Sequence, residues 1–280
     1  MRTTLLTAAS AAALVLTAGA AAAQEQTWDG LYIGTYAGVQ GLTDSQDSER
    51  IQFDRDLNGS FNDTIVTGTG VNAFNPGFCD SRAGGPTGAQ ACSQERARPE
   101  YGLRIGYDRQ FGGWVVGGVA EIGGSDVRDS VTAFSITPAY YTMNRRLSGL
   151  GAARLRVGYG TDGVLNRPIL GYVTGGVAAG RVERSFATSN ATNTFTERGD
   201  DGYAYGYQLG AGLETRVNSN VTVGLEYMYT TLNDDDYRVR VAGGAAGNPF
   251  LVGNAGGADF RRGNDDFNTH SLRVNLGYRF

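Results

Sequence analysis

Apolar residues alternate with polar or small ones in several segments, and this two-residue period is the feature that most constrains the fold. The last nine residues, 272-LRVNLGYRF-280, place Leu, Val, Leu, Tyr and Phe on one face, with Arg, Asn, Gly and Arg on the other. Residues 202–214, 221–229 and 100–108 alternate in the same way. Successive side chains of a β-strand point to opposite faces, so each segment is predicted to be a strand with one apolar face.

Four further segments alternate less strictly and bring the number of predicted strands to eight. They are residues 31–42, 114–124, 149–160 and 169–180. Each predicted strand is about a dozen residues long, which suits a tilted crossing of a lipid bilayer that needs roughly 9–11 residues. After residue 23 there is no apolar stretch of the roughly 18 residues that a membrane-spanning helix requires, which excludes a helical membrane protein.

The connections between the predicted strands alternate in length. The short ones are expected at 112–113, 161–167 and 218–220, and the long ones at about 43–99, 127–147, 185–201 and 234–267. An even number of strands with alternating long and short connections is typical of outer-membrane barrels. A soluble β-sandwich is the alternative, but it would rarely carry so many tyrosines on its buried face. We therefore predict an all-β fold: an eight-stranded antiparallel transmembrane β-barrel with short periplasmic turns and long extracellular loops.

Three segments resemble a known family, the small OmpA-like and opacity-protein-like outer-membrane barrels of Gram-negative bacteria, often filed as porin family. The segment 28-WDGLYIGTYAG-38 resembles the first strand of that family, and 170-LGYVTGGVAAG-180 resembles its fifth. The ending 276-LGYRF-280 resembles the signal read by the barrel-assembly machinery, with Tyr278 and Phe280 as its aromatic residues. The resemblance implies an outer-membrane location, with lipid, lipopolysaccharide, periplasmic chaperones and the assembly machinery as partners. It does not specify an activity, and no peptidoglycan-binding domain is expected after the last strand.

The first 23 residues are predicted to be a cleaved signal peptide. One Arg precedes an apolar run from Leu5 to about Ala18, and an A-x-A cleavage pattern ends at Ala23. The barrel is then expected to comprise residues 24–280, with a long extracellular loop at about 43–99.

Charged residues on the predicted strands fall opposite the apolar face, so in a barrel they point into the lumen. They are Arg104, Asp108, Glu121, Arg154, Arg156, Glu214, Glu226 and Arg273. An eight-stranded barrel has room only for its own side chains, so we expect these charges to pair in a plugged interior. A charge-lined channel is the alternative. The formal net charge of −4 and the lack of basic clusters exclude a footprint for nucleic acid.

The two cysteines of the chain, Cys79 and Cys92, lie in the long first loop. An exported chain passes through an oxidising compartment, so a disulfide between them is expected. Closing a loop of this length contributes about 3 kcal/mol to ordering it. We interpret the pair as a structural link on the cell surface.

The stretch 53-FDRDLNGSFND-63 combines two patterns. Three oxygen-bearing residues stand at the first, third and fifth places of an EF-hand calcium loop: Asp54, Asp56 and Asn58. The twelfth place holds Ile65 instead of the bidentate Glu that such a loop needs. Asn-Gly between alternating residues favours a type I′ hairpin turn, which is the preferred interpretation. Weak calcium binding is kept as a hypothesis, and no other cofactor is expected.

These patterns predict a non-enzymatic integral barrel that supports membrane integrity and surface interaction through its extracellular loops. The alternative is a narrow passive porin for small solutes. A more distant alternative is an outer-membrane hydrolase that uses His270 and Ser271 with Asp265 or Asp266. Neighbouring residues of a strand point to opposite faces, however, so His270 and Ser271 are not expected to meet. The surface ligand is not specified by the sequence.

Overall fold

The computed structural model describes most of the chain, as residues 27–43, 49–88, 92–161, 167–199, 201–234, 237–245 and 247–280. The predicted signal peptide lies outside these residues. The described part consists mainly of β-strands and contains a short 3₁₀-helix at Pro249–Leu251. None of the described residues forms a helix long and apolar enough to cross a membrane.

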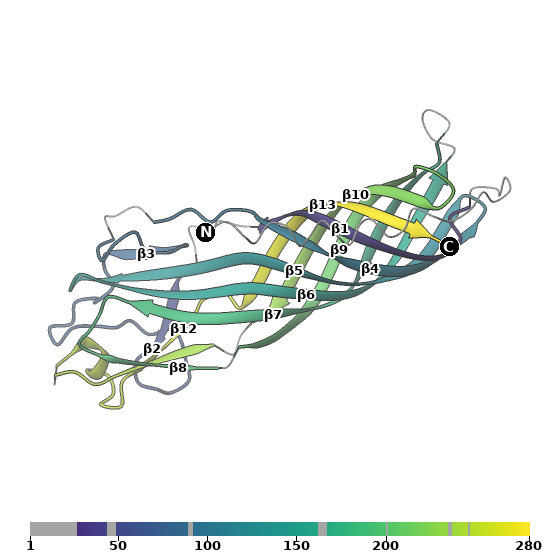
Figure 1. The fold of residues 1–280 in the computed structure, drawn as a ribbon. Coiled ribbons are helices and arrows are strands. Elements are labelled where there is room, and N and C mark those ends of the chain that lie inside the picture. The colour runs from purple at the N-terminus through teal and green to yellow at the C-terminus, as the bar shows by residue number, and fades with distance from the viewer. Residues whose placement is uncertain are drawn as a thin grey trace.

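Eight strands form a closed antiparallel barrel (Figure 1). They are β1 (Gly30–Leu42), β4 (Arg98–Phe111), β5 (Trp114–Ser135), β6 (Ala139–Thr161), β7 (Ile169–Thr188), β9 (Gly202–Arg216), β10 (Val221–Asn233) and β13 (Asp266–Arg279). The first and last strands pair with each other, and β5 pairs with both β4 and β6, which completes the ring. The predicted eight-stranded antiparallel barrel is therefore confirmed.

Three of the barrel strands continue well beyond the others. β5, β6 and β7 have 22, 23 and 20 residues, whereas β1 and β10 have 13. The prediction of a long loop at 127–147 was wrong, because β5 and β6 are joined by a turn at 136–138. The pairing register shifts between Gly124 and Val127, and beyond that bulge the alternation resumes with Val127 and Val131 on the buried face.

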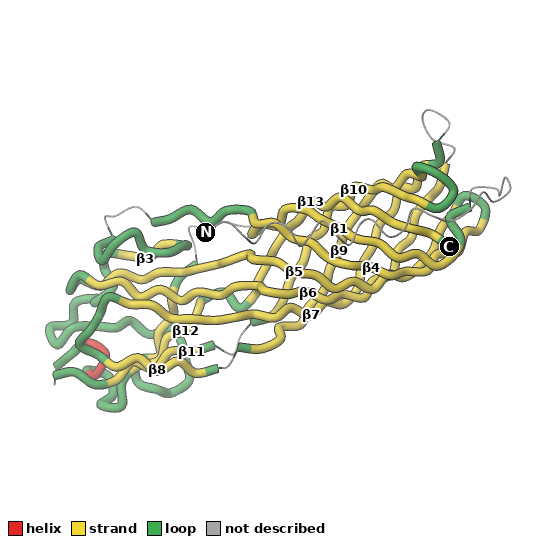
Figure 2. The backbone as a smooth tube through the Cα atoms, viewed as in Figure 1, coloured by secondary structure: helices red, strands yellow, loops and turns green. Residues whose placement is uncertain are grey.

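The long connections add a second, four-stranded sheet at the end of the molecule far from the C-terminus (Figures 1 and 2). Its order is β2 (Ile51–Asp54), β12 (Ala258–Arg262), β11 (Arg238–Ala242) and β8 (Thr194–Arg198). A short strand of the first connection, β3 (Gly77–Cys79), pairs instead with the extension of β5. We call the second sheet, β3 and the extensions of β5, β6 and β7 the loop domain.

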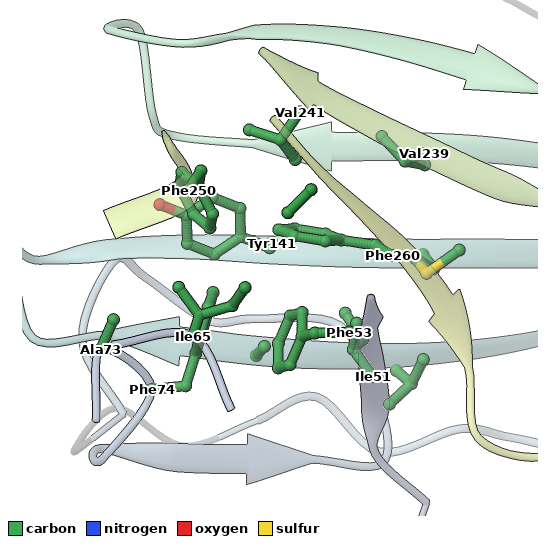
Figure 3. Close-up of a cluster of buried hydrophobic side chains, with 14 of the residues drawn as sticks. Ile51, Phe53, Ile65, Ala73, Phe74, Tyr141, Val239, Val241, Phe250 and Phe260 are labelled. Carbon is green, nitrogen blue, oxygen red and sulfur yellow. The ribbon is translucent and has the colours of Figure 1, made fainter. Parts of the chain in front are cut away.

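Apolar side chains from both sheets form the core of the loop domain (Figure 3). Phe260 of β12 lies at its centre, with ring centroids 4.9 Å from Phe53 and 5.9 Å from Tyr141 of β6. Phe53 in turn stacks on Phe74 at 4.5 Å. Other buried members are Ile51, Ile65, Val131, Met143, Val239, Val241 and Phe250. The long connections therefore fold into a structure with a hydrophobic core of its own.

The outer face of the barrel carries large apolar side chains that are exposed to the surroundings. Leu103, Ile122, Leu155 and Val177 are each more than 60% exposed. Aromatic residues border this belt: Trp114 and Tyr159 lie near the short turns, and Tyr203 and Tyr205 lie towards the loop domain. A soluble protein would bury such a surface, whereas a lipid bilayer solvates it.

Candidate functional site

The barrel interior holds a layer of paired charges near the short turns. Arg156 of β6 donates to both carboxylate oxygens of Asp108 of β4 through one edge of its guanidinium, with Nε–Oδ1 at 2.8 Å and Nη2–Oδ2 at 2.7 Å. It also contacts Glu214 of β9 at 3.0 Å. Arg279 of β13 donates to Asp108 Oδ2 at 2.7 Å. Side chains from four strands are thus joined across the lumen.

A second charged layer lies closer to the loop domain. Glu121 of β5 accepts from Arg154 and from Arg273, each at 2.7 Å. Arg273 also donates to Glu100 at 2.8 Å. Glu226 of β10 lies 3.7 Å from both Arg104 and Arg154 and accepts a hydrogen bond from the Tyr172 hydroxyl at 3.1 Å. The structure therefore brings all the charges expected in the lumen into two connected layers, and it adds Glu100 and Arg279 to them.

Tyrosine rings fill the space between the lumen charges. Arg273 lies 4.5 Å from the ring centroid of Tyr36, and Arg156 lies 4.8 Å from that of Tyr172. Glycine makes room for the rings: a Cβ on Gly102 would lie 2.6 Å from the Tyr36 ring, and one on Gly123 would lie 2.2 Å from its hydroxyl. The small residues of the lumen face are therefore packing partners of large aromatic side chains.

Apolar layers cross the barrel on both sides of the charged layers. Near the short turns, Trp28 packs with Val115, Leu170 and Tyr172. Towards the loop domain, a larger cluster draws side chains from seven of the eight barrel strands: Leu42, Val127, Leu147, Leu150, Ala178, Val182, Ala204, Leu232 and Phe267. The charged side chains between these layers are at most 7% exposed. A wide water-filled pore would leave more of their surface accessible, so the interior is packed.

A third charged network joins the barrel to the loop domain, and we call it the neck network. Asp129 of β5 accepts from Arg145 of β6 at 2.7 Å and from Arg262 of β12 at 2.8 Å. Arg262 also bonds Glu49 of the first connection at 2.6 Å. Burial raises the pKa of Asp129, but Arg262 and Arg145 outweigh this effect and hold the pKa below its ordinary value.

Sequence reasoning missed the neck network because it placed Asp129 and Arg145 in a loop. Both residues continue the inward series of their strands, since Asp129 stands between Val127 and Val131, which are buried. Extending the two-residue period of β5 beyond Gly124 would have placed Asp129 on the inward face. The inward positions of β6 change from even to odd numbers between Leu150 and Leu147, so the same extension would not have placed Arg145 there.

The predicted disulfide between Cys79 and Cys92 is present, with the two Cα atoms 6.4 Å apart. Cys79 is the last residue of β3 and pairs with Thr132 of β5. The bond therefore ties the end of the first connection to β3, which in turn pairs with β5.

The stretch 53–63 does not form the expected type I′ turn, because positive φ angles occur at Leu57 and Gly59 and not at Asn58. Phe53 pairs with Asp63, so the turn is longer than two residues. The Asp54 carboxylate accepts from the backbone N–H groups of Asn58 at 3.1 Å and Gly59 at 2.8 Å. These hydrogen bonds stabilise the longer loop.

Three carboxylates of this loop come close together. Oxygen atoms of Asp54, Asp56 and Asp63 lie within 4.8 Å of one another. The Asp63 carboxylate also accepts from the backbone N–H of Arg55 at 2.8 Å, and that of Asp56 accepts from the Asn58 side chain at 2.9 Å. The weak calcium hypothesis for Asp54, Asp56 and Asn58 stays a prediction.

The other residues singled out by the sequence lie on the barrel wall. His270 is exposed on the outer face, whereas Ser271 is buried in the lumen and accepts from Arg273 Nε at 3.1 Å. At the end of β13, the rings of Tyr278 and Phe280 are in edge contact with centroids 5.2 Å apart. The backbone N–H of Phe280 donates to Leu31 of β1 at 3.0 Å, next to the strand pair that closes the barrel.

Comparison with known proteins agrees with this architecture. Residues 10–280 match the family model described as outer membrane protein beta-barrel domain. The 31 kDa outer-membrane immunogenic protein of Brucella melitensis is 28% identical over 263 residues, covering 91% of this chain and 84% of that protein. The 22 kDa outer membrane protein of Rhizobium leguminosarum is 30% identical over 175 residues, covering 62% and 63%.

Among solved structures, that of OprG from Pseudomonas aeruginosa aligns with 90% of this chain and 96% of its own, at 14% identity and a TM-score of 0.45. The family match spans nearly the whole chain, and the related proteins are named for the outer membrane. The predicted location is thereby confirmed. The chain is an integral protein of the bacterial outer membrane and belongs to the outer-membrane protein β-barrel family.

Proposed function

We propose that this protein is a non-enzymatic, non-conducting membrane anchor that displays the loop domain on the cell surface for contact with external partners. The long connections of an outer-membrane barrel face outward, which places the loop domain outside the cell. The barrel then serves to hold that domain in the membrane and contributes to the integrity of the outer membrane.

The observation that carries this proposal is the hydrophobic core of the loop domain. Phe53, Phe74, Tyr141, Phe250 and Phe260 come from three separate parts of the chain, the first connection, β6 and the last connection, and pack together outside the barrel. Fixing the backbone of a residue costs about 1–2 kcal/mol, so ordered loops need a compensating burial of apolar surface. The burial of these five aromatic side chains favours a loop domain with a fixed shape, and a fixed shape suits specific recognition of a partner.

The packed interior supports the non-conducting part of the proposal. Two charged layers lie between two apolar layers, and Arg156 and Arg273 have less than 2% of their surface exposed. Moving an ion through such an interior would require several buried ion pairs to separate, each at a cost of several kcal/mol. This arrangement argues against the passive porin.

A comparison of two variants in cells tests the proposal. Phe260→Ala removes the central ring of the loop-domain core, and Glu226→Gln removes a charge in the lumen. We measure attachment of the cells to solid surfaces and to each other, together with uptake of a small chromogenic β-lactam. The proposal predicts that Phe260→Ala reduces attachment and that neither variant changes uptake. A porin would give altered uptake with Glu226→Gln and unchanged attachment with Phe260→Ala.

We further propose that the barrel-assembly machinery recognises Tyr278 and Phe280 during insertion, and that lipopolysaccharide surrounds the outer half of the barrel. The two rings lie together at the end of β13, next to the strand pair that closes the barrel. Phe280→Ser should reduce the amount of folded barrel in the outer membrane, while Phe111→Ser on the same outer face should not. Equal amounts for both variants would contradict the assembly role.

A further inference from the structure

The segment around the disulfide rests on the edge of β5 above the barrel. We call residues 77–88 and 92–97 the disulfide segment. Cys79 pairs with Thr132, whose hydroxyl donates to the Ser81 carbonyl at 2.7 Å. Farther along, Glu95 Oε1 accepts from the backbone N–H of Ser130 at 2.7 Å. The segment is therefore held on β5 at two places, one on each side of the disulfide.

Carboxylates outnumber guanidinium groups where this segment meets the neck network. Among the described residues, oxygen atoms of Glu49, Asp80 and Asp129 lie within 4.8 Å of one another. Glu95 also lies close enough to Asp129 and Asp80 for their charges to act on it. Asp80 is under the influence of the negative charges of Glu49 and Asp129 and the positive charge of Arg262. Glu95 is under the influence of the negative charges of Asp129 and Asp80 and the same positive charge of Arg262.

The two neighbouring arginines have other partners. Arg262 donates to Glu49, to Asp129 and to the backbone carbonyls of Asp129 and Met143. Arg145 donates to Asp129 and to the carbonyls of Asn264 and Asp266. The hydrogen bonds of both arginines are thus directed to groups other than Asp80 and Glu95.

Protonation relieves this excess of negative charge. Burial and the nearby Glu49 and Asp129 raise the pKa of Asp80 to about 7. Burial and Asp129 raise the pKa of Glu95 to about 8. A cavity of about 660 Å³ is lined by Glu49, Asp80 and Asp129, so water can reach the cluster and exchange protons with it.

We propose that the disulfide segment is a pH-sensitive latch, which lies closed on β5 while Asp80 and Glu95 each hold a proton and opens when they lose it. Once these carboxyls are ionised, they face Asp129 and Glu49 as like charges at close range, and this repulsion drives the segment away from β5. The disulfide makes the segment move as one unit.

The direction of the pH effect follows from the raised pKa values. In the open segment, Asp80 and Glu95 have their ordinary pKa values of about 4. Between about pH 4 and the higher pKa values of the closed form, the closed form therefore binds more protons than the open form. Closure is therefore fully favoured below about pH 4 and weakens as the pH rises towards 8. Above that range both forms are ionised, and opening is at its maximum.

Limited trypsin digestion of the full-length protein in nanodiscs tests the latch. Cleavage after Arg82 reports opening, because the preceding residue, Ser81, is buried in the closed segment and its carbonyl accepts from the Thr132 hydroxyl of β5 at 2.7 Å. Rates are divided by those of an unfolded peptide of the same sequence, which removes the pH dependence of trypsin. We expect the corrected rate to be at least about tenfold higher at pH 8.5 than at pH 5.5.

The variant Asp80→Asn/Glu95→Gln keeps the shape of the protonated side chains and carries no charge. We expect slow cleavage of this variant at both pH values. Asp126→Asn, which changes a partly exposed carboxylate on the outer face of β5, serves as the matched control and should retain the full pH response. Hydrogen exchange of the segment in the wild type provides a second readout that needs no substitution. A wild-type segment equally protected at both pH values, or a double variant with the wild-type response, would overturn the proposal.

Discussion

Arg156 and Asp108 form a two-pronged ion pair inside the barrel, with both atom pairs within 2.8 Å. The two residues come from β6 and β4, which both pair with β5, so the ion pair crosses the inner face of β5. Both side chains are almost completely buried. The pair therefore holds β4 and β6 in place from inside the barrel.

The substitution Asp108→Asn should destabilise the barrel strongly. It leaves the charges of Arg156 and Arg279 without their shared carboxylate, and breaking a buried ion pair from one side costs about 3–5 kcal/mol. Urea unfolding of the protein in lipid vesicles measures this loss. The control Asp126→Asn removes partly exposed ion pairs with Arg128 and Arg146, and we expect a change of about 1 kcal/mol or less. Equal losses for the two variants would contradict a structural role for the lumen pair.

The loop domain should lose stability independently of the barrel. Phe260→Ala removes the ring that touches Phe53, Phe250 and Tyr141, and such a cavity costs about 3–5 kcal/mol. Hydrogen exchange should increase in β2, β11 and β12, while the folded barrel still shows its heat-dependent shift in gel mobility. Val252→Ala, at an exposed position nearby, should change neither property. Loss of the barrel signal with Phe260→Ala would mean that the two parts fold as one unit.

Removing the disulfide should affect the first connection alone. Replacing Cys79 and Cys92 by Ser releases a closed loop, which lowers the stability of the loop domain by up to about 3 kcal/mol. We expect faster proteolysis after Arg82 and unchanged urea unfolding of the barrel. A large loss of barrel stability would show that the disulfide supports the membrane-spanning part.

Calcium binding to the stretch 53–63 can be measured by isothermal titration. The close approach of Asp54, Asp56 and Asp63 leads us to expect millimolar affinity, as in extracellular calcium modules. Asp56→Asn should weaken binding several-fold, because it removes a charged ligand and leaves the hydrogen bonds of Asp54 in place. A titration without heat, or equal affinity in the variant, would exclude the site.

Strict alternation allowed half of the strands and their outward faces to be predicted with little ambiguity. Tyr203, Tyr205 and Tyr207 were placed on the lipid-facing side by a regular series, and they are exposed there. Tyr32 and Tyr36 gave no such series, because β1 carries small or apolar residues on both faces. Their rings fill the lumen, which depends on glycines of other strands and could not be inferred from β1 alone.

The loop domain could not be predicted for a different physical reason. Its core joins Phe53, Tyr141 and Phe260, which come from widely separated parts of the chain. Short strands such as β2 and β11 are only four or five residues long, and their pairing depends on these distant contacts. A local period of two residues cannot distinguish them from extended loop. The irregularity between Leu147 and Gly149 had a similar effect, because the inward positions of β6 change from odd to even numbers there.

The central claim is that the lumen is packed and that the loop domain is the functional part of the protein. Single-channel recording of the refolded barrel in a planar bilayer tests this claim most directly, with the disulfide Cys79–Cys92 intact and after its reduction. We predict no stable, stepwise openings in either state, with correct folding verified by the gel-mobility shift. Stable openings that change in size with Glu226→Gln would contradict the claim, because they would place an ion path along the charged layers of the lumen.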